Sequence, residues 1–220
     1  MTLFNRIKPV ALAILICVGL VAQSKPGYTQ STETLTVAGG CFWCVEADFE
    51  KVAGVIEAVS GYTGGTTENP TYKQVTRGGT GHYEAVKITF DPSIVSRSRL
   101  LSLFFQSIDP TDAGGQFCDR GESYRTAIFV SNTSEKTLAT TAKVEAQATL
   151  GQSIVTPILD EAPFYPAEAY HQDYAKSDDL ILTRFGPRKK SAAYTLYRSA
   201  CGRDDRVRAL WGDNAPFVGS

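Results

Sequence analysis

Hydrophobic and polar residues follow two different periods along the chain from about residue 34 onward. Residues 35–38 have the composition of a short strand, two glycines follow, and apolar residues then recur at helical spacing up to residue 54. Residues 82–90 alternate between apolar and polar side chains, which is typical of a strand with one buried face. The same patterns predict further strands at 55–60, 124–130 and 154–159, and further helices at 93–106 and 134–150.

Three stretches lack such a period. Residues 61–70 are rich in glycine and threonine, end in Asn-Pro and are predicted to form a loop. Residues 109–123 are also predicted to be irregular, and a long loop of this kind indicates a functional role. Tyr170 and Tyr174 mark a short helix, after which the chain is basic and aperiodic, so we expect it to wrap the core as a tail.

The order of these elements predicts the fold class. Strands alternating with helices favour an α/β (α+β) two-layer sandwich, with the helices packed on a mixed or antiparallel sheet. We expect a ferredoxin-like core followed by a long irregular C-terminal segment. One domain over residues 34–220 suits a chain of 220 residues, 43% of them hydrophobic.

The N-terminus has the pattern of a targeting segment. Arg6 and Lys8 precede an apolar run over 9–22, which is shorter than the roughly 20 residues that span a bilayer. We therefore expect a signal peptide at 1–23, a linker at 24–33 and a periplasmic or secreted protein. Membrane anchoring by an uncleaved segment and lipidation at Cys17 are the alternatives.

The charge balance excludes one class of partner. The chain has 22 Lys and Arg residues against 23 Asp and Glu residues, for a formal net charge of -1. Nucleic acid binding needs a basic surface, so no nucleic acid partner is expected.

Cysteine usage indicates redox chemistry. Four cysteines follow the predicted signal peptide: Cys41, Cys44, Cys118 and Cys201. An even number in an exported protein usually means structural disulfides, but a domain of this size does not need them to fold. Cys41 stands at the predicted start of a helix, where free N–H groups and the helix dipole stabilise a thiolate. It is the candidate nucleophile.

Glu84 is a candidate acid. It shares the strand parity of Val86 and Ile88, which places its carboxyl on the apolar face of the strand at 82–90. Burial raises the pKa of a carboxyl and keeps it protonated, as a general acid requires.

Several segments carry a resemblance to a known family. These are GGCFWCVE at 39–46, GYTGG at 61–65, NPTY at 69–72, GHYEAV at 81–86, DPT at 109–111, Asp119, Tyr124-Arg125 and YHQ at 170–172. In this order, over about residues 34–174, the chain resembles peptide methionine sulfoxide reductase A.

The resemblance implies an activity and roles for these residues. Cys41 would attack the sulfur of methionine S-sulfoxide, free or in proteins, and Glu84 would protonate the oxygen. The remaining site residues would bind the oxygen (Tyr72, Tyr124), hold the polar network through water (Asp119) and cradle the methyl group (Phe42, Trp43). The resulting sulfenic acid would form an intramolecular disulfide, reduced by an external dithiol such as thioredoxin or a periplasmic equivalent. No cofactor and no metal are implied, and we expect a monomer.

The resolving cysteine is left open by the sequence. Cys44 stands where the family usually has glycine, and its spacing from Cys41 permits a direct disulfide. Cys201 lies in the C-terminal segment where the family usually keeps its resolving cysteine, and it is slightly favoured. Cys118, beside Asp119, is the third candidate.

Two other functions fit parts of the pattern. A thioredoxin-like disulfide oxidoreductase also carries Cys-x-x-Cys at a helix start, but Phe42 and Trp43 lie between the cysteines here, where that class has tryptophan before the first one. A structural zinc module would use all four cysteines, although zinc sites usually show two tight pairs. His171 is expected to pack or hydrogen-bond rather than act as a base.

Overall fold

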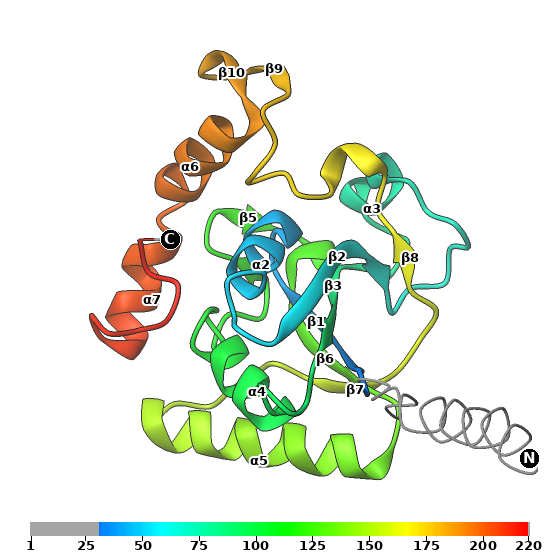
Figure 1. Cartoon of the computed structure of the whole chain (residues 1–220), viewed down its shortest axis with the longest axis vertical. Coiled ribbons are helices and arrows are strands. Elements are labelled where there is room, and N and C mark those ends of the chain that lie inside the picture. The colour runs from blue at the N-terminus through cyan, green and yellow to red at the C-terminus, as the bar shows by residue number, and fades with distance from the viewer. Residues whose placement is uncertain (1–30, 220) are drawn as a thin grey trace, which may run out of the picture. The chain divides into compact units, whose positions relative to one another are not determined.

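Residues 31–219 are described by the computed structural model of the chain (Figure 1). The predicted signal peptide at 1–23 and most of the predicted linker lie outside the described residues. Within 31–219, no helix is both long enough and apolar enough to cross a membrane.

A six-stranded sheet forms the centre of the fold, with the strand order β7-β6-β1-β3-β2-β8. All neighbouring strands are antiparallel except β6 and β7, which are parallel. The prediction of a mixed, mainly antiparallel sheet is therefore confirmed. Its strands are β1 (Glu33–Gly39), β2 (Val55–Thr63), β3 (Tyr83–Phe90), β6 (Thr126–Val130), β7 (Ile158–Asp160) and β8 (Tyr165–Pro166).

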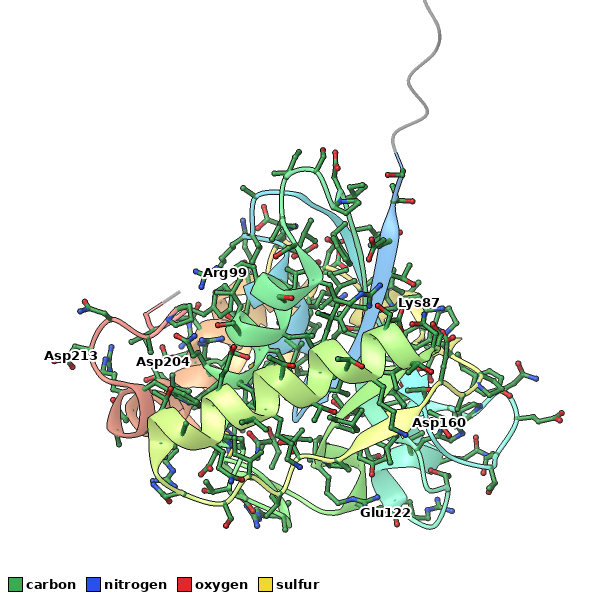
Figure 2. All side chains as sticks on the ribbon, turned by 90° about the horizontal axis from the view of Figure 1, so that it is seen from below. Lys87, Arg99, Glu122, Asp160, Asp204 and Asp213 are labelled. Carbon is green, nitrogen blue, oxygen red and sulfur yellow. A yellow bond between two sulfur atoms is a disulfide. The ribbon has the colours of Figure 1, made fainter. Side chains whose placement is uncertain are left out.

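Helices α2 (Phe42–Phe49), α4 (Arg97–Phe105) and α5 (Thr133–Leu150) pack against this sheet. The main apolar cluster joins alternate side chains of β1 and β3 to these helices, as the predicted two-layer arrangement requires. The long helix α5 lies across the fold in Figure 2, while Asp213 near the C-terminus lies at the periphery. Asn132 accepts a hydrogen bond from the Glu135 amide at 2.9 Å and so caps the start of α5.

The regions predicted as loops contain more regular structure than expected. Strand β2 continues to Thr63, and α3 (Tyr72–Arg77) begins at a capping box formed by Thr71 and Gln74. Between 109 and 124 the chain forms the hairpin β4 (Gly115–Gln116) and β5 (Asp119–Arg120), then a 3-10 turn at Glu122–Tyr124. These elements have few residues each, so they show no hydrophobic period.

The C-terminal segment differs from the irregular tail that was expected. It contains a hairpin, β9 (Leu180–Thr183) and β10 (Gly186–Lys189), followed by helices α6 (Lys190–Ala200) and α7 (Arg203–Trp211). Two buried arginines hold these helices in place: Arg198 lies 2.9 Å from Asp48 of α2, and Arg203 lies 3.9 Å from the same carboxylate. Hydrophobic periodicity does not detect α7, whose buried face carries Arg203.

We predict that Asp48→Ala destabilises the protein strongly, because it leaves Arg198 and Arg203 buried beside the site of a lost negative charge. Removing one partner of a buried ion pair costs roughly 3–5 kcal/mol. The free energy of unfolding in urea measures this loss. Asp205→Ala is the control, since it removes the exposed partner of Arg208 at 3.0 Å on α7 and should cost less than about 1 kcal/mol. Equal losses in the two variants would contradict the anchoring role.

Candidate active site

Three neighbouring inner strands of the sheet, β6, β1 and β3, have termini that lie side by side at one end of the sheet. Strand β1 is antiparallel to β3 with Val37 opposite Val86, and Gly39 at its end is paired with Thr126 at the start of β6. The end of β1 therefore lies beside the starts of β3 and β6. This brings together Cys41 after β1, Glu84 in β3 and Tyr124 before β6.

Cys41 is the N-cap residue of α2. The turn before it depends on glycine, because Gly40 has φ +83° and a Cβ there would lie 2.5 Å from the Cβ of Gln116. Gln116 is itself fixed, since its side chain accepts a hydrogen bond from the Asp109 amide at 2.9 Å and donates one to the Asp109 carbonyl at 2.8 Å. The buried pair Asp109 and Gln116 thus sets the position of the cysteine.

Cys41 and Cys44 form a coupled pair of free thiols. Their mutual hydrogen bond, with the positive charges of Arg203 and Arg198, lowers the pKa of Cys44 to about 7. The same hydrogen bond, together with burial and the nearby carboxyls of Glu84 and Asp119, raises the pKa of Cys41. The nearby arginines therefore favour ionisation of Cys44, while the nearby carboxyls disfavour ionisation of Cys41.

The carboxyl of Glu84 is buried beside the start of α2. The Phe42 amide donates a hydrogen bond to Glu84 Oε2 at 3.1 Å, while buried Oε1 has no hydrogen-bond partner among the described residues. Burial is the main cause that raises the pKa of Glu84 to about 8. The group is thus protonated at neutral pH.

A cavity of about 470 Å³ connects these groups. All ten site residues predicted from the sequence line it: Cys41, Phe42, Trp43, Cys44, Tyr72, Glu84, Cys118, Asp119, Tyr124 and Cys201. The structure therefore brings together side chains from six separate segments of the chain.

Aromatic side chains form one wall of the cavity. Trp43 stacks on Tyr174 with ring centroids 3.8 Å apart, and Phe42 stacks on Tyr72 at 6.2 Å. The Trp43 indole donates a hydrogen bond to Nδ1 of His171 at 3.1 Å. Burial lowers the pKa of His171 to about 4, so the ring is neutral and accepts this bond. His171 therefore fixes the orientation of the Trp43 ring in this wall, which agrees with the expectation that it packs or forms a hydrogen bond.

The part of the cavity lining that contains Glu84 also carries the polar groups of Tyr72 and Tyr124. The hydroxyls of Tyr72 and Tyr124 lie near one another, and burial raises the pKa of both phenols. The position of Tyr72 is fixed by Glu168, which accepts hydrogen bonds from the Tyr72 amide and from the Tyr62 hydroxyl, both at 2.9 Å. Glu168 was not predicted, because no motif or period in the sequence marks it.

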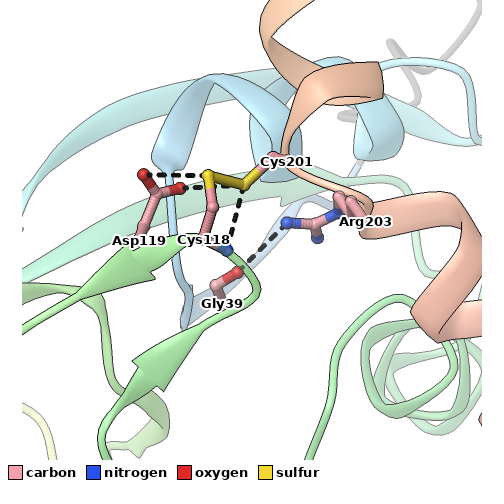
Figure 3. Close-up of a disulfide and its surroundings, with 5 residues drawn as sticks. All are labelled: Gly39, Cys118, Asp119, Cys201 and Arg203. Carbon is pink, nitrogen blue, oxygen red and sulfur yellow. Dashed lines mark hydrogen bonds between the residues drawn. A yellow bond between two sulfur atoms is a disulfide. The ribbon is translucent and has the colours of Figure 1, made fainter.

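A disulfide joins Cys118 and Cys201 at the rim of the cavity (Figure 3). The Asp119 carboxylate lies against it, 3.9 Å from Cys118 Sγ and 4.0 Å from Cys201 Sγ. Burial raises the pKa of Asp119. A four-cysteine zinc site would need four thiolates, and this bond uses two of the sulfurs.

Arg203 connects the disulfide region to the loop before Cys41. Its guanidinium donates hydrogen bonds to the carbonyls of Gly39 at 3.4 Å and Ser107 at 2.9 Å, and it faces the Phe117 ring at 4.7 Å. Sequence reasoning missed this residue because a single arginine in a basic segment is most often solvated.

Comparison with known proteins identifies the family. The sequence profile described as peptide methionine sulfoxide reductase matches residues 33–204. The chain belongs to this family. Its match extends about 30 residues beyond the resemblance seen in the sequence, and so includes Cys201 and Arg203.

Individual family members are similar over most of the chain. Peptide methionine sulfoxide reductase MsrA of Bacillus licheniformis is 48% identical over 189 residues, covering 83% of this chain and 96% of that protein. MsrA 2 of Rhizobium meliloti is 47% identical over 178 residues, covering 81% and 83%. These matches favour the methionine sulfoxide reductase interpretation over a thioredoxin-like oxidoreductase.

Solved structures of the family share the fold. Reduced Mxr1 from Saccharomyces cerevisiae has a TM-score of 0.62 at 27% identity, covering 69% of this chain and 88% of that one. Methionine sulfoxide reductase A of Corynebacterium diphtheriae has a TM-score of 0.59 at 31% identity, covering 69% and 75%.

We predict that the carboxyl of Glu84 makes stability depend on pH. Its pKa is about 8 in the folded protein against an ordinary value of 4.5, so the folded protein keeps a proton that the unfolded chain has lost between these values. The free energy of unfolding should therefore fall by roughly 1 kcal/mol per pH unit between pH 5 and 8, relative to Glu84→Gln. Urea unfolding of both proteins across this range measures it. Parallel curves would show that Glu84 is ionised when folded.

Proposed function

We propose that this protein reduces methionine S-sulfoxide to methionine, with Cys41 as the nucleophile and Glu84 as the general acid. One observation carries the proposal: a protonated, buried carboxyl is bonded to the first amide of the helix that Cys41 caps, and both groups open into one aromatic cavity. Family membership supports the reaction class.

The first step transfers oxygen from the substrate to Cys41. As the Cys41 sulfur attacks the sulfoxide sulfur, its proton passes to the Cys44 thiolate and Glu84 gives a proton to the oxygen. The protonated oxygen then moves to the Cys41 sulfur: the substrate S–O bond and the transient bond between the two sulfurs break, a bond between the Cys41 sulfur and the oxygen forms, and methionine leaves Cys41 as a sulfenic acid. The substrate sulfur gains two electrons and the Cys41 sulfur loses two.

The cavity walls suit the two ends of the sulfoxide group. Phe42 and Trp43 offer apolar surface to the methyl group, which has no hydrogen-bonding capacity. Tyr72 and Tyr124 are kept protonated by burial and donate to the oxygen, with Asp119 completing the polar side. This division orients the sulfur toward Cys41.

Cys44 forms the first disulfide in this proposal. It lies one helical turn from Cys41 and has a free thiol, whereas Cys201 and Cys118 are already bonded to one another. Attack by Cys44 on the sulfenic acid releases water and leaves a Cys41–Cys44 disulfide.

Cys118 and Cys201 then pass reducing equivalents inward. In the dithiol form they exchange with the Cys41–Cys44 disulfide, which restores both inner thiols and closes the outer disulfide. Asp119, beside both outer sulfurs, accepts the proton of the attacking thiol. Because Cys118 is exposed, an external dithiol protein such as thioredoxin, or a periplasmic equivalent, can reduce the outer pair.

The protein acts outside the cytoplasm and as a monomer in this proposal. The apolar run over 9–22 supports export, and a disulfide such as Cys118–Cys201 persists in oxidising compartments. The N-terminal sequence of the mature protein tests export.

We predict that the wild type consumes only the S epimer of N-acetylmethionine sulfoxide when dithiothreitol is the reductant. Cys41→Ser should abolish turnover, and Glu84→Gln should lower kcat by about 10²–10⁴ because an amide cannot donate a proton. Glu57→Gln, an exposed carboxyl on β2, is the matched control and should leave turnover unchanged. Consumption of the R epimer, or activity of Cys41→Ser, would refute the proposal.

We predict that the fully reduced protein consumes two equivalents of methionine sulfoxide when no reductant is present. Four thiols hold four electrons, and each sulfoxide takes two. A protein with the Cys118–Cys201 bond already formed, and the Cys118→Ser/Cys201→Ser variant, should each consume one equivalent. Chromatographic counting of methionine per protein measures this. A single equivalent from the fully reduced wild type would show that the outer pair does not exchange.

A further inference from the structure

The hairpin formed by β9 and β10 carries exposed apolar side chains. Leu180 is 78% exposed and Leu182 is 84% exposed, more than any other large hydrophobic residue in 31–219. Both lie on the same face of β9, since they are two residues apart in a strand. Side chains of this kind rarely gather on a surface without a partner.

The hairpin is continuous with the active-site cavity. Residues Ile181, Leu182, Thr183 and Arg184 all line the cavity that contains Cys41. Ile181 is partly buried and packs against the apolar cluster that contains Tyr174 and Tyr194, which holds the strand at the cavity. A molecule that extends out of the cavity past Leu182 would therefore continue onto the exposed leucines.

The strand also offers a free backbone edge. Among the described strands, β9 pairs with β10 alone. Its other edge therefore presents N–H and C=O groups without a strand partner, which an extended peptide can use. Free methionine sulfoxide has neither apolar flanks nor enough backbone to reach this strand.

The chemistry of the substrate indicates which molecule has such flanks. Methionine is mostly buried in folded proteins and is surrounded by apolar residues in the core. When it is oxidised, the polar sulfoxide disrupts the core, so the damaged segment becomes exposed with its apolar neighbours. An extended segment of this kind matches an apolar strand beside the cavity.

We propose that the β9 strand is a docking surface for unfolded polypeptide, on which Leu180 and Leu182 bind the apolar residues next to the methionine sulfoxide. The inference rests on the proposed function and deepens it, because it assigns a surface outside the cavity to the residues that flank the methionine sulfoxide. Arg184 is held at the cavity by the rings of Phe185 and Tyr197, at 4.8 and 5.0 Å, so it fixes the end of the surface.

The test compares two substrates with dithiothreitol as the reductant. One is N-acetylmethionine sulfoxide, and the other is a five-residue peptide with two leucines on each side of methionine sulfoxide. In the Leu180→Ser/Leu182→Ser variant, we expect the ratio of kcat/KM for the peptide to that for the small substrate to fall about tenfold, mainly through KM. A matched control, Ile94→Ser/Val144→Ser, removes two residues that are 63% and 61% exposed and do not line the cavity, and should leave the ratio unchanged.

Each other outcome overturns the inference in a distinguishable way. An unchanged ratio in the hairpin variant means that β9 does not bind polypeptide. A loss that appears only when a dithiol protein replaces dithiothreitol assigns the leucines to the reductant instead. If the wild type reduces neither substrate, the proposed function itself fails.

Discussion

The hydrogen bond from the Phe42 amide to the carboxyl of Glu84 ties the catalytic helix to the sheet. It fixes the start of α2 against the start of β3, and so sets Cys41 relative to the acid. The bond also forms in a space that excludes water, which keeps Glu84 protonated and leaves Oε1 free to donate. The hydrogen bond itself lowers the pKa of the carboxyl, so the protonated state that the proposed chemistry needs exists because burial outweighs this bond.

The C-terminal helices α6 and α7 line part of the active-site cavity and also contribute positive charge to it. Arg198 and Arg203 approach Asp48 of α2, and their charges favour a thiolate at Cys44. Since Arg203 also binds the carbonyl of Gly39, the segment that carries Cys201 is connected to the loop that carries Cys41. Docking of the C-terminal segment and the electrostatics of the thiol pair thus depend on the same two side chains.

The sequence predicted the long periodic elements and the residues of the site, but it did not predict the short helices or the disulfide pairing. Long periodic elements such as α5 and β3 were predicted within a few residues, and the parity of Glu84 placed its carboxyl on the buried face. Helix α7 was missed because its buried contacts include an arginine, and α3 because a short capped turn has no period. The bond between Cys118 and Cys201 spans 83 residues, so only the three-dimensional arrangement could select it among the possible pairings.

The account depends most on Cys41 as the sulfur that receives the oxygen. Cys44→Ser protein with the Cys118–Cys201 disulfide intact should be mixed with one equivalent of methionine sulfoxide and a probe that alkylates sulfenic acids. Without a resolving thiol, the oxidised cysteine is trapped, and mass spectrometry of the digested protein should show the label on Cys41 alone. Methionine formation with no label on Cys41, or with the label on another residue, would contradict the account.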